Sequence, residues 1–185
     1  QGSKPVMWSP VEKTALAEAE VEYHDKESFT IWVKFKVANE DHKLSGAQVV
    51  IWTTTPWTIP SNKAVVFGQG IAYGLYEVTG TPEESWVAVG DKYILADNLA
   101  ADVMKRARLG EDQFTRVADV SADDLDGVGL KHPLHGAEGS NGEWDGLRDF
   151  RAAPFVTDTE GTGFVHCAPS HGMEEFELYR DLGML

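Results

Sequence analysis

The stretch from Gly161 to Glu175, GTGFVHCAPSHGMEE, combines a strand signal, a turn signal and a helix start within a short span. Residues 164–166 alternate as a strand interior does, and the Pro, Ser and Gly within residues 169–172 then interrupt the strand. Glu174 and Glu175 stand where a helix would begin, and carboxylates in a first helical turn complement the helix dipole. We therefore predict a short strand that ends in a polar turn and continues into a helix.

A second stretch of the same design lies far upstream, from Ile51 to Asn62, with the sequence IWTTTPWTIPSN. The apolar run of residues 49–52 predicts a buried strand, and Pro56 ends it because proline has no N–H for the ladder. Hydroxyl groups follow on three consecutive residues, Thr53, Thr54 and Thr55. Two strand ends that carry hydroxyl, imidazole and carboxylate groups predict a polar pocket beside a β-sheet.

Taken singly, these residues also have purely structural explanations. Threonine is a β-branched strand former, and His166 would be a core histidine with satisfied hydrogen bonds. Glu174 and Glu175 would then do no more than complement a helix dipole. Composition and spacing alone therefore predict a polar pocket on a β-rich domain and leave its chemistry open.

Length and composition indicate a single globular domain. The chain has 185 residues, of which 42% are apolar and 25% charged, and no apolar run reaches the length of a membrane span. Its single cysteine, Cys167, excludes an internal disulfide and favours a reducing compartment, the cytoplasm. We interpret Gln1–Ser3 as a cloning remnant and residues 4–185 as one domain excised from a larger protein.

The net charge of −14 argues against autonomous nucleic-acid binding, because nonspecific affinity for phosphates comes mainly from Lys and Arg. This charge is compatible with a domain that handles a nucleic-acid end delivered by a neighbouring domain. Most of the carboxylates are interpreted as a solvated acidic surface.

Hydrophobic periodicity predicts many short strands and two helices. Strands are expected at residues 16–23, 29–37, 48–55, 63–68, 71–78, 85–89, 114–120 and 154–157. Helices are expected at residues 91–110, where apolar residues repeat at i+4 and basic residues gather late, and at about 172–182. Residues 136–146 are predicted to form a mobile loop. The lack of regular βαβ alternation favours an α+β or mostly β fold, a curled, mainly antiparallel sheet or barrel with peripheral helices.

Three common kinds of site are not supported by the residues. His132 and His135 flank a proline turn, and one cysteine cannot build a thiolate site, so no metal centre is predicted. His166 stands where a dinucleotide-binding fingerprint needs its third glycine. Cys167 alternates away from His166, which disfavours a Cys–His nucleophilic pair and indicates a small core side chain.

Together, the segments WTTTPWTIPSN (52–62) and GTGFVHCAPSHGMEEF (161–176) closely resemble the two signature segments of the editing domain inserted in bacterial-type isoleucyl-tRNA synthetases. Further similar segments extend over nearly the whole chain, among them DKYILADNLAADV (91–103) and FVTDTEGTG (155–163). Sister editing domains for valine and leucine carry an Arg after a Thr pair, where this chain has Thr55. Neither the HIGH nor the KMSKS signature of the aminoacylation core is present, so this chain is not expected to activate amino acids.

This resemblance implies a β-barrel-like editing domain with peripheral helices. It also implies hydrolysis, by a positioned water, of the ester between misattached valine and the 3′-terminal adenosine of tRNA(Ile), with valyl-adenylate as a further candidate substrate. The implied partners are the tRNA 3′-CCA end and the rest of the synthetase chain, with no membrane contact. No cofactor is expected for this domain, since ATP and Mg²⁺ belong to the aminoacylation core of the parent enzyme.

The resemblance also implies roles for individual residues. Thr53, Thr54 and Thr55 match a threonine run that contacts the terminal ribose, the carboxyl end of the amino acid and the hydrolytic water. His166 matches a histidine that lines the pocket for the amino-acid side chain, where its bulk clashes with isoleucine. The family has an aspartate that holds the α-ammonium group nine residues further on, where this chain has Glu175.

Trp57 and Asn62 match family positions near the terminal nucleotide, and Glu174 is assigned to substrate binding beside Glu175. Glutamate keeps the charge of the family's aspartate but is longer by one C–C bond, about 1.5 Å. Two alternatives therefore accompany the main prediction. One is a module that binds aminoacyl-adenosine or the CCA end without hydrolysis, and the other is an editing domain for a different misacylated tRNA.

Overall fold

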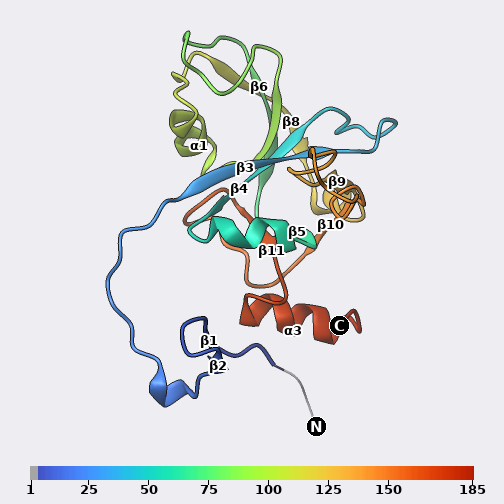
Figure 1. The fold of residues 1–185 in the computed structure, drawn as a ribbon. Helices are drawn as coiled ribbons and strands as arrows, with labels where there is room; N and C mark the ends of the chain where they lie inside the picture. The colour runs from blue at the N-terminus through green and yellow to red at the C-terminus, as the bar shows by residue number, and fades with distance from the viewer. Residues whose placement is uncertain (1–3) are drawn as a thin grey trace.

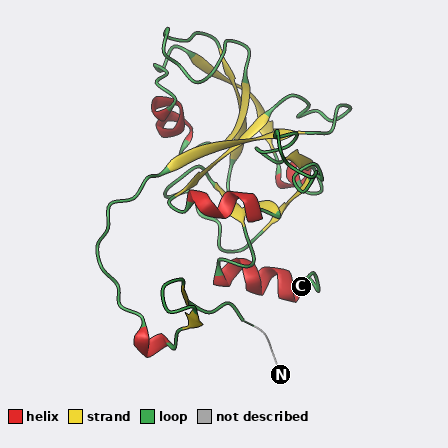
Figure 2. Cartoon of the chain, viewed as in Figure 1, coloured by secondary structure: helices red, strands yellow, loops and turns green. Residues whose placement is uncertain are grey.

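A computed structural model describes residues 4–185, and the interpretation of Gln1–Ser3 as a cloning remnant lies outside them. The body is a nine-stranded mixed sheet that curls around an apolar core, with short helices on its outer surface (Figure 1). A two-stranded hairpin near the N-terminus lies apart from this sheet (Figure 2). The predicted mostly β class with peripheral helices is thus confirmed.

The elements have the following bounds. The large sheet contains β3 (Ile31–Val37), β4 (Gln48–Thr53), β5 (Ala64–Phe67), β6 (Tyr73–Val78), β7 (Lys92–Ala96), β8 (Phe114–Val120), β9 (Gly129–Lys131), β10 (Arg148–Ala152) and β11 (Phe164–Cys167). The hairpin consists of β1 (Trp8–Ser9) and β2 (Thr14–Ala15). The helices are α1 (Ala100–Arg106), α2 (Ala122–Leu125) and α3 (Met173–Asp181), with two 3₁₀ segments, η1 (Glu18–Glu20) and η2 (Pro56–Ser61).

The large sheet is ordered β11-β5-β10-β9-β3-β4-β7-β6-β8, with parallel pairing at β5–β10 and β4–β7 and antiparallel pairing elsewhere. Its two edges are β11 and β8, so hydrogen bonds do not close a barrel within the described chain. The sheet nevertheless curls until β11 packs beside β4. This curl brings together the two strands that carry the segments quoted above.

Several central strands are apolar on both faces because both faces are covered. In β5, Val65 belongs to the inner core, whereas Val66 packs on the side that α3 covers. In β4, Ile51 belongs to the inner core, whereas Val50 packs beneath α1. Strands buried on both faces appear in a sequence as continuous apolar runs, and this explains the patterns at residues 49–52 and 64–67.

The helix predicted at residues 91–110 is wrong in its first half, which forms β7. Tyr93 and Leu95 pack towards α1, whereas Ile94 lies in the inner core, so the local period is two rather than 3.6. Pairing with β4 and β6 overrides the helical pattern of the sequence. Asp91 accepts a hydrogen bond from the Tyr93 hydroxyl (2.9 Å) instead of capping a helix, and α1 begins only at Ala100.

Two of the predicted strands do not form. Residues 16–23 contain only the short segment η1 and are largely exposed, because no strand in the described chain pairs with them. Residues 85–89 form turns at the end of α1, where the Ser85 hydroxyl donates to the Ala107 carbonyl oxygen (3.1 Å). Val87 packs against α1 while Trp86 stays 75% exposed, so the apparent alternation reflects a loop lying on a helix.

The strand predicted at residues 154–157 is also wrong, because the strand in this region is β10 and ends before them. Ala153 N–H still donates to the Phe67 carbonyl oxygen (2.8 Å), and Pro154, which has no N–H, ends the pairing. Strands β9 and β10 were not predicted, since their flanks are rich in turn residues. The remaining predicted strands and the final helix are confirmed, with bounds shifted by a few residues.

The N-terminal arm, residues 4–30, extends away from the curled sheet (Figure 1). It leaves large apolar side chains exposed, including Trp8 at 59%, Tyr23 at 85% and Phe29 at 87%. These side chains contribute nothing to the three apolar clusters, which lie entirely within residues 33–179. Among the described residues, no helix is long and apolar enough to cross a membrane.

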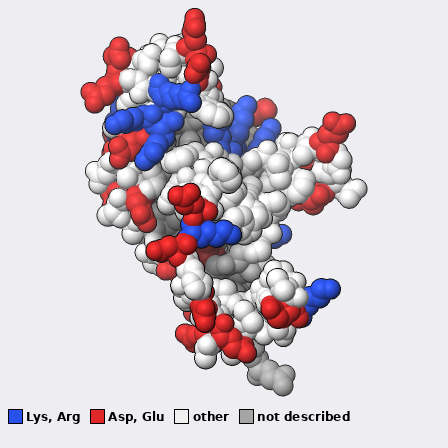
Figure 3. All heavy atoms as spheres, turned by 60° about the vertical axis from the view of Figure 1, so that its left-hand side comes forward, with Lys and Arg blue, Asp and Glu red and all other residues white. Residues whose placement is uncertain are grey.

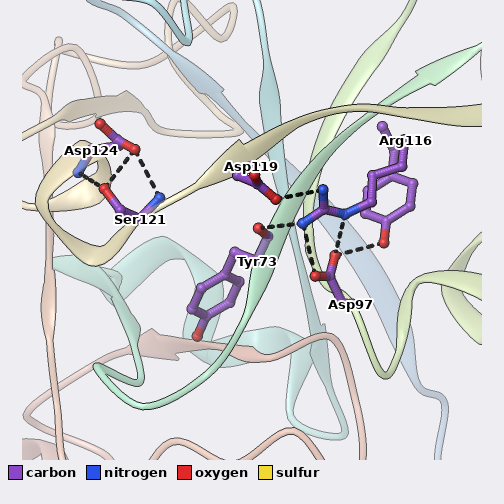
Figure 4. Close-up of polar contacts among 7 residues, drawn as sticks. Tyr73, Asp97, Arg116, Asp119, Ser121 and Asp124 are labelled. Atoms are coloured by element: carbon purple, nitrogen blue, oxygen red, sulfur yellow. Dashed lines mark hydrogen bonds and ion pairs between the residues drawn. The ribbon is translucent and has the colours of Figure 1, made fainter.

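A charged network joins β8 to β6 and to the end of β7 (Figure 4). Arg116 donates to both oxygens of Asp97, at 2.9 Å each, and to the Tyr73 carbonyl oxygen (3.2 Å). The Tyr76 hydroxyl also donates to Asp97 (2.7 Å). A Cβ atom on Gly74 would lie 2.6 Å from Arg116 Nε, so glycine here lets the guanidinium lie across the strand.

We predict that Asp97→Asn lowers the free energy of unfolding by about 1 kcal/mol, because it leaves a partly exposed guanidinium without its two-pronged acceptor. Urea denaturation at neutral pH measures this cost. Asp119→Asn is the matched control: Asp119 also pairs with Arg116 but is 93% exposed, so its loss should change the unfolding free energy by no more than about 0.5 kcal/mol.

The same pair sets a pH dependence. The Arg116 guanidinium holds the pKa of Asp97 below its usual value, with a further contribution from the Tyr76 hydroxyl. This stabilisation is present above the unfolded pKa of about 3.9 and is lost as pH falls through the lower folded pKa. The stability gap between wild type and Asp97→Asn should therefore close in strong acid, and a gap that is constant with pH contradicts this account.

Candidate functional site

The two segments singled out in the sequence meet where β4 and β11 end. Strand β4 ends at Thr53 and continues through Thr54 and Thr55 into η2, whereas β11 ends at Cys167 and turns towards α3. Directly after η2, Lys63 N–H donates to the Cys167 carbonyl oxygen (2.9 Å), at the start of the β5–β11 ladder. Backbone pairing thus places η2 alongside the end of β11.

His166 connects these two segments through side-chain hydrogen bonds. It is only 9% exposed, and its Nδ1 lies 2.9 Å from Asn62 Nδ2 while its Nε2 lies 2.8 Å from Thr58 Oγ1. The Asn62 amide nitrogen also donates to the Ala64 carbonyl oxygen (2.8 Å). The Thr58 hydroxyl donates to the Thr55 carbonyl oxygen (2.8 Å). Both imidazole nitrogens are therefore held by residues of, or next to, η2.

These contacts assign one neutral tautomer to His166. An amide nitrogen can only donate, so Nδ1 accepts from Asn62, and the ring proton resides on Nε2 and is donated to Thr58. Burial, together with the nearby His132 and His171, lowers the pKa of His166 to about 4. At neutral pH, His166 is an uncharged and rigidly oriented wall, too weak a base to serve as a general base.

The three threonines divide between anchoring and exposure. Thr53 is buried, and its Oγ1 accepts a hydrogen bond from Thr55 N–H (3.1 Å) and lies 3.2 Å from the Thr55 hydroxyl. Thr54 and Thr55 are exposed. The end of β4 therefore offers hydroxyl groups to a ligand from a backbone that Thr53 holds in place.

Glu175 lies in the first turn of α3 and folds back over the helix N-terminus. Its carboxylate fills the space beside Gly172, where a Cβ atom would lie 1.7 Å from Oε2. Burial raises the pKa of Glu175, and the neighbouring Glu174 raises it further. Burial, and then the charge of Glu175, raise the pKa of the Cys167 thiol to about 12. Glu175 therefore lies at the N-terminus of α3, the helix whose Tyr179 shares an apolar cluster with Cys167.

The structure brings some of the predicted site residues together and not others. Asn62 and His166 are in direct contact, and the threonines are joined to His166 through Thr58. No hydrogen bond within the described chain joins Glu175 to a threonine of residues 51–62 or to His166. Trp57 on η2 is 66% exposed, and Glu174 is exposed on α3.

Three residues that support this arrangement were not predicted as site residues. Thr58 lies within residues 51–62, and its hydroxyl, four residues before Asn62, was the available signal. His132 donates from Nε2 to the Ile59 carbonyl oxygen (2.9 Å), and Trp144 donates to that of Pro60 (3.0 Å). The two rings stack with their centroids 6.0 Å apart. They hold the end of η2 through its carbonyl oxygens, and neither lies in the two segments from which the site was predicted.

Solved structures provide a comparison for the fold. The crystal structure of GlLeuRS-CP1 is similar with a TM-score of 0.60 and 16% identity, covering 83% of this chain and 59% of that chain. The P. falciparum cytosolic leucyl-tRNA synthetase editing domain is similar with a TM-score of 0.61 and 10% identity, covering 83% of this chain and 67% of that chain. The chain therefore has the fold of an aminoacyl-tRNA synthetase editing domain.

No family model matches the chain, but curated sequences are similar to it over its whole length. Isoleucine–tRNA ligase of Ruegeria pomeroyi is 79% identical over 185 residues, which are 100% of this chain and 19% of the relative. That of Bradyrhizobium diazoefficiens is 52% identical over 97% of this chain and 18% of the relative. The chain is therefore similar over nearly its whole length to isoleucine–tRNA ligases, and it spans about a fifth of the length of these relatives.

The depressed pKa of His166 predicts a loss of stability in mild acid. The unfolded histidine titrates near 6.5 and the folded one near 4, so the stabilisation is complete above 6.5 and is lost as pH falls towards 4. At pH 5 we expect a loss of about 2 kcal/mol relative to pH 7.5 from this residue. In His166→Gln the difference between the two pH values, measured by urea denaturation, should be smaller by that amount.

His24→Gln serves as the control, because His24 is 79% exposed on the N-terminal arm. Its pH dependence of unfolding should match that of wild type within about 0.5 kcal/mol. Equal pH dependence in all three proteins would mean that His166 is not held neutral by burial.

Proposed function

We propose that this chain is the proofreading module of an isoleucine–tRNA ligase and hydrolyses valine misattached to tRNA(Ile). In this proposal, water attacks the ester carbonyl carbon, the bond to the terminal ribose oxygen breaks, and free valine and the tRNA 3′-hydroxyl are released. Valyl-adenylate is a second candidate substrate. The partners are the 3′-CCA end and the remainder of the synthetase, and the setting is the cytoplasm.

The chemical need for a second pocket follows from the size of one methylene group. Burial of a CH₂ is worth about 0.8 kcal/mol, which corresponds to a factor of roughly four in affinity. An aminoacylation site that accepts isoleucine also admits valine, because the smaller side chain fits the same space. A second pocket that admits valine and rejects isoleucine multiplies the two selectivities.

The observation that carries the proposal is the immobilised His166 at the meeting point of β4, η2 and β11. Its ring cannot rotate without breaking hydrogen bonds to both Thr58 and Asn62. A rigid ring can exclude a side chain by its bulk, whereas a freely rotating ring would move aside. Its neutrality also keeps a positive charge away from the α-ammonium group of the substrate.

The side chains favour attack by water over covalent catalysis. Cys167 is fully buried and the pKa of its thiol is raised to about 12, so the thiolate needed for nucleophilic attack does not form at neutral pH. His166 uses both ring nitrogens in fixed contacts. The exposed Thr54 and Thr55 then remain to orient water and the substrate's polar groups, an effect of positioning rather than of proton abstraction.

Glu175 is assigned to the substrate's α-ammonium group. The half-buried carboxylate at Gly172 has no cation partner among the ion pairs of the described chain, and its pKa is raised. An arriving ammonium group would lower that pKa and favour the ionised form. The carboxylate lies at Gly172 and makes no hydrogen bond to the threonines in the described chain, so engagement with a substrate at the threonines requires it to move away from Gly172.

Incubation of the chain with valyl-tRNA(Ile) and isoleucyl-tRNA(Ile), against a protein-free control, tests the function. We expect faster loss of the valyl ester alone. Glu175→Ala should reduce this rate at least about 100-fold, since loss of the ammonium contact removes substrate positioning. Glu175→Asp should retain activity, because the family uses aspartate at this position.

Two further outcomes separate the alternatives. Binding of an unreactive valyl-adenosine analogue without ester loss would indicate a module that binds but does not hydrolyse. Faster loss of a threonyl ester than of the valyl ester would indicate a different misacylated substrate. Gly172→Ala is the matched variant for Glu175: it displaces the carboxylate from Gly172 without removing it, so, unlike Glu175→Ala, it should retain hydrolysis.

A further inference from the structure

A second cleft lies on the outer face of the sheet, away from His166 and the threonines. It has a volume of about 710 Å³ and opens between α1, strands β3, β4 and β7, and the loop that contains Trp86. The charged and aromatic side chains lining it are Trp32, Lys34, Trp86, Tyr93, Arg106 and Arg108. Among the described residues that line it, none is Asp or Glu.

The charge of this cleft is opposite to that of the chain. The sequence has 30 acidic and 16 basic residues, yet Lys and Arg gather on the upper part of the face seen in Figure 3. Arg108 pairs with Glu84 at 3.0 Å, but no ion pair within the described chain involves Arg106 or Lys34. These two cations lie instead over aromatic rings, Arg106 at 5.5 Å from Trp32 and Lys34 at 5.9 Å from Tyr93.

The aromatic side chains of the cleft are exposed beyond what packing requires. Trp86 is 75% exposed and Trp32 is 38% exposed, so both leave ring surface open to a planar ligand. Cations interleaved with exposed aromatic rings form the kind of surface that binds single-stranded nucleic acid, in which phosphates meet Lys and Arg and bases stack on rings. A cleft that binds a protein partner has no comparable reason to lack carboxylates in its lining.

One residue that lines the cleft, Trp32, pairs with the strand that leads to the candidate site. Trp32 stands opposite Trp52 in the β3–β4 ladder, with ring centroids 6.4 Å apart. Trp52 directly precedes Thr53, and Thr54 and Thr55 follow at the exposed strand end. The outer face of β3 and β4 therefore forms a path from the basic cleft to the threonines.

We infer that this cleft binds the unpaired 3′ segment of a tRNA, with bases stacked on Trp32 and Trp86 and phosphates near Lys34, Arg106 and Arg108. The inference rests on the proposed function and adds a surface outside the two signature segments. Few cations are available, so affinity in the isolated chain is weak and depends on salt.

The test is a titration of the ¹⁵N-labelled chain with a short single-stranded RNA that ends in CCA, followed by NMR. We expect the indole N–H signals of Trp32 and Trp86 and the amides of α1 to shift. Arg106→Ala and Trp86→Ala should each weaken binding about tenfold, whereas Lys131→Ala, an exposed cation on β9, should leave it within about twofold. An abasic strand of equal length should bind more weakly than the RNA, because it cannot stack.

Three results would overturn the inference: no shift at millimolar RNA, shifts that map away from the cleft, or equal effects of Arg106→Ala and Lys131→Ala. Shifts that map away from the cleft, or equal effects of the two variants, would indicate that another part of the synthetase chain contacts this face. Trp86 is largely exposed, so loss of binding in Trp86→Ala does not arise from unfolding, and the unchanged remainder of the NMR spectrum verifies this.

Failure of the cleft and failure of the proposed function are distinguishable. A valyl ester of adenosine alone is too short to occupy the cleft, so Arg106→Ala and Trp86→Ala should hydrolyse it as wild type does and lose rate only on valyl-tRNA(Ile). RNA binding without valyl-ester hydrolysis by wild type would refute the proofreading function alone. Equal hydrolysis of valyl-tRNA(Ile) by all variants would refute the cleft alone.

Discussion

The structure depends on one buried imidazole that must have both of its nitrogens satisfied. His166 lies where water cannot replace a missing partner, so loss of the Asn62 or Thr58 contact would cost the full desolvation of a polar atom. That requirement determines where η2 lies relative to β11. His132 and Trp144 also hold η2, because they donate hydrogen bonds to the carbonyl oxygens of Ile59 and Pro60. The end of β4 is thereby held between two layers of hydrogen bonds.

The curled sheet separates three environments that a flat sheet would merge. Its inner face holds the largest apolar cluster, and its outer face is divided between α1 and α3. The candidate site lies at the strand ends, where backbone pairing stops and polar side chains reach the surface. The basic cleft lies on the outer face beneath α1, and Trp52 and Trp32 lie between it and the threonines. Rigid strands therefore position both surfaces.

The local signals of the sequence were sufficient where one strand face or one turn decides the structure. Strands with strict alternation, such as β3, and runs closed by proline, such as β4, were predicted near their observed bounds. The failures have a common cause. Residues 92–96 carry helical spacing but form β7 because β4 and β6 flank them, and residues 16–23 alternate but find no partner. Strand β10 pairs in parallel with β5, a contact that no local pattern encodes.

The sequence by itself determined the chemical inventory: the threonine run, the single cysteine, the histidine at position 166 and the acidic balance of the chain. It also determined the family resemblance, which the similarity to isoleucine–tRNA ligases confirms. Only the tertiary structure decided which of these groups meet. Asn62 and His166 touch because β5 pairs with β11, whereas the carboxylate of Glu175 lies at the N-terminus of α3, in the space beside Gly172. Burial and hydrogen bonding, which set these contacts and the protonation of His166, arise only when distant segments pack together.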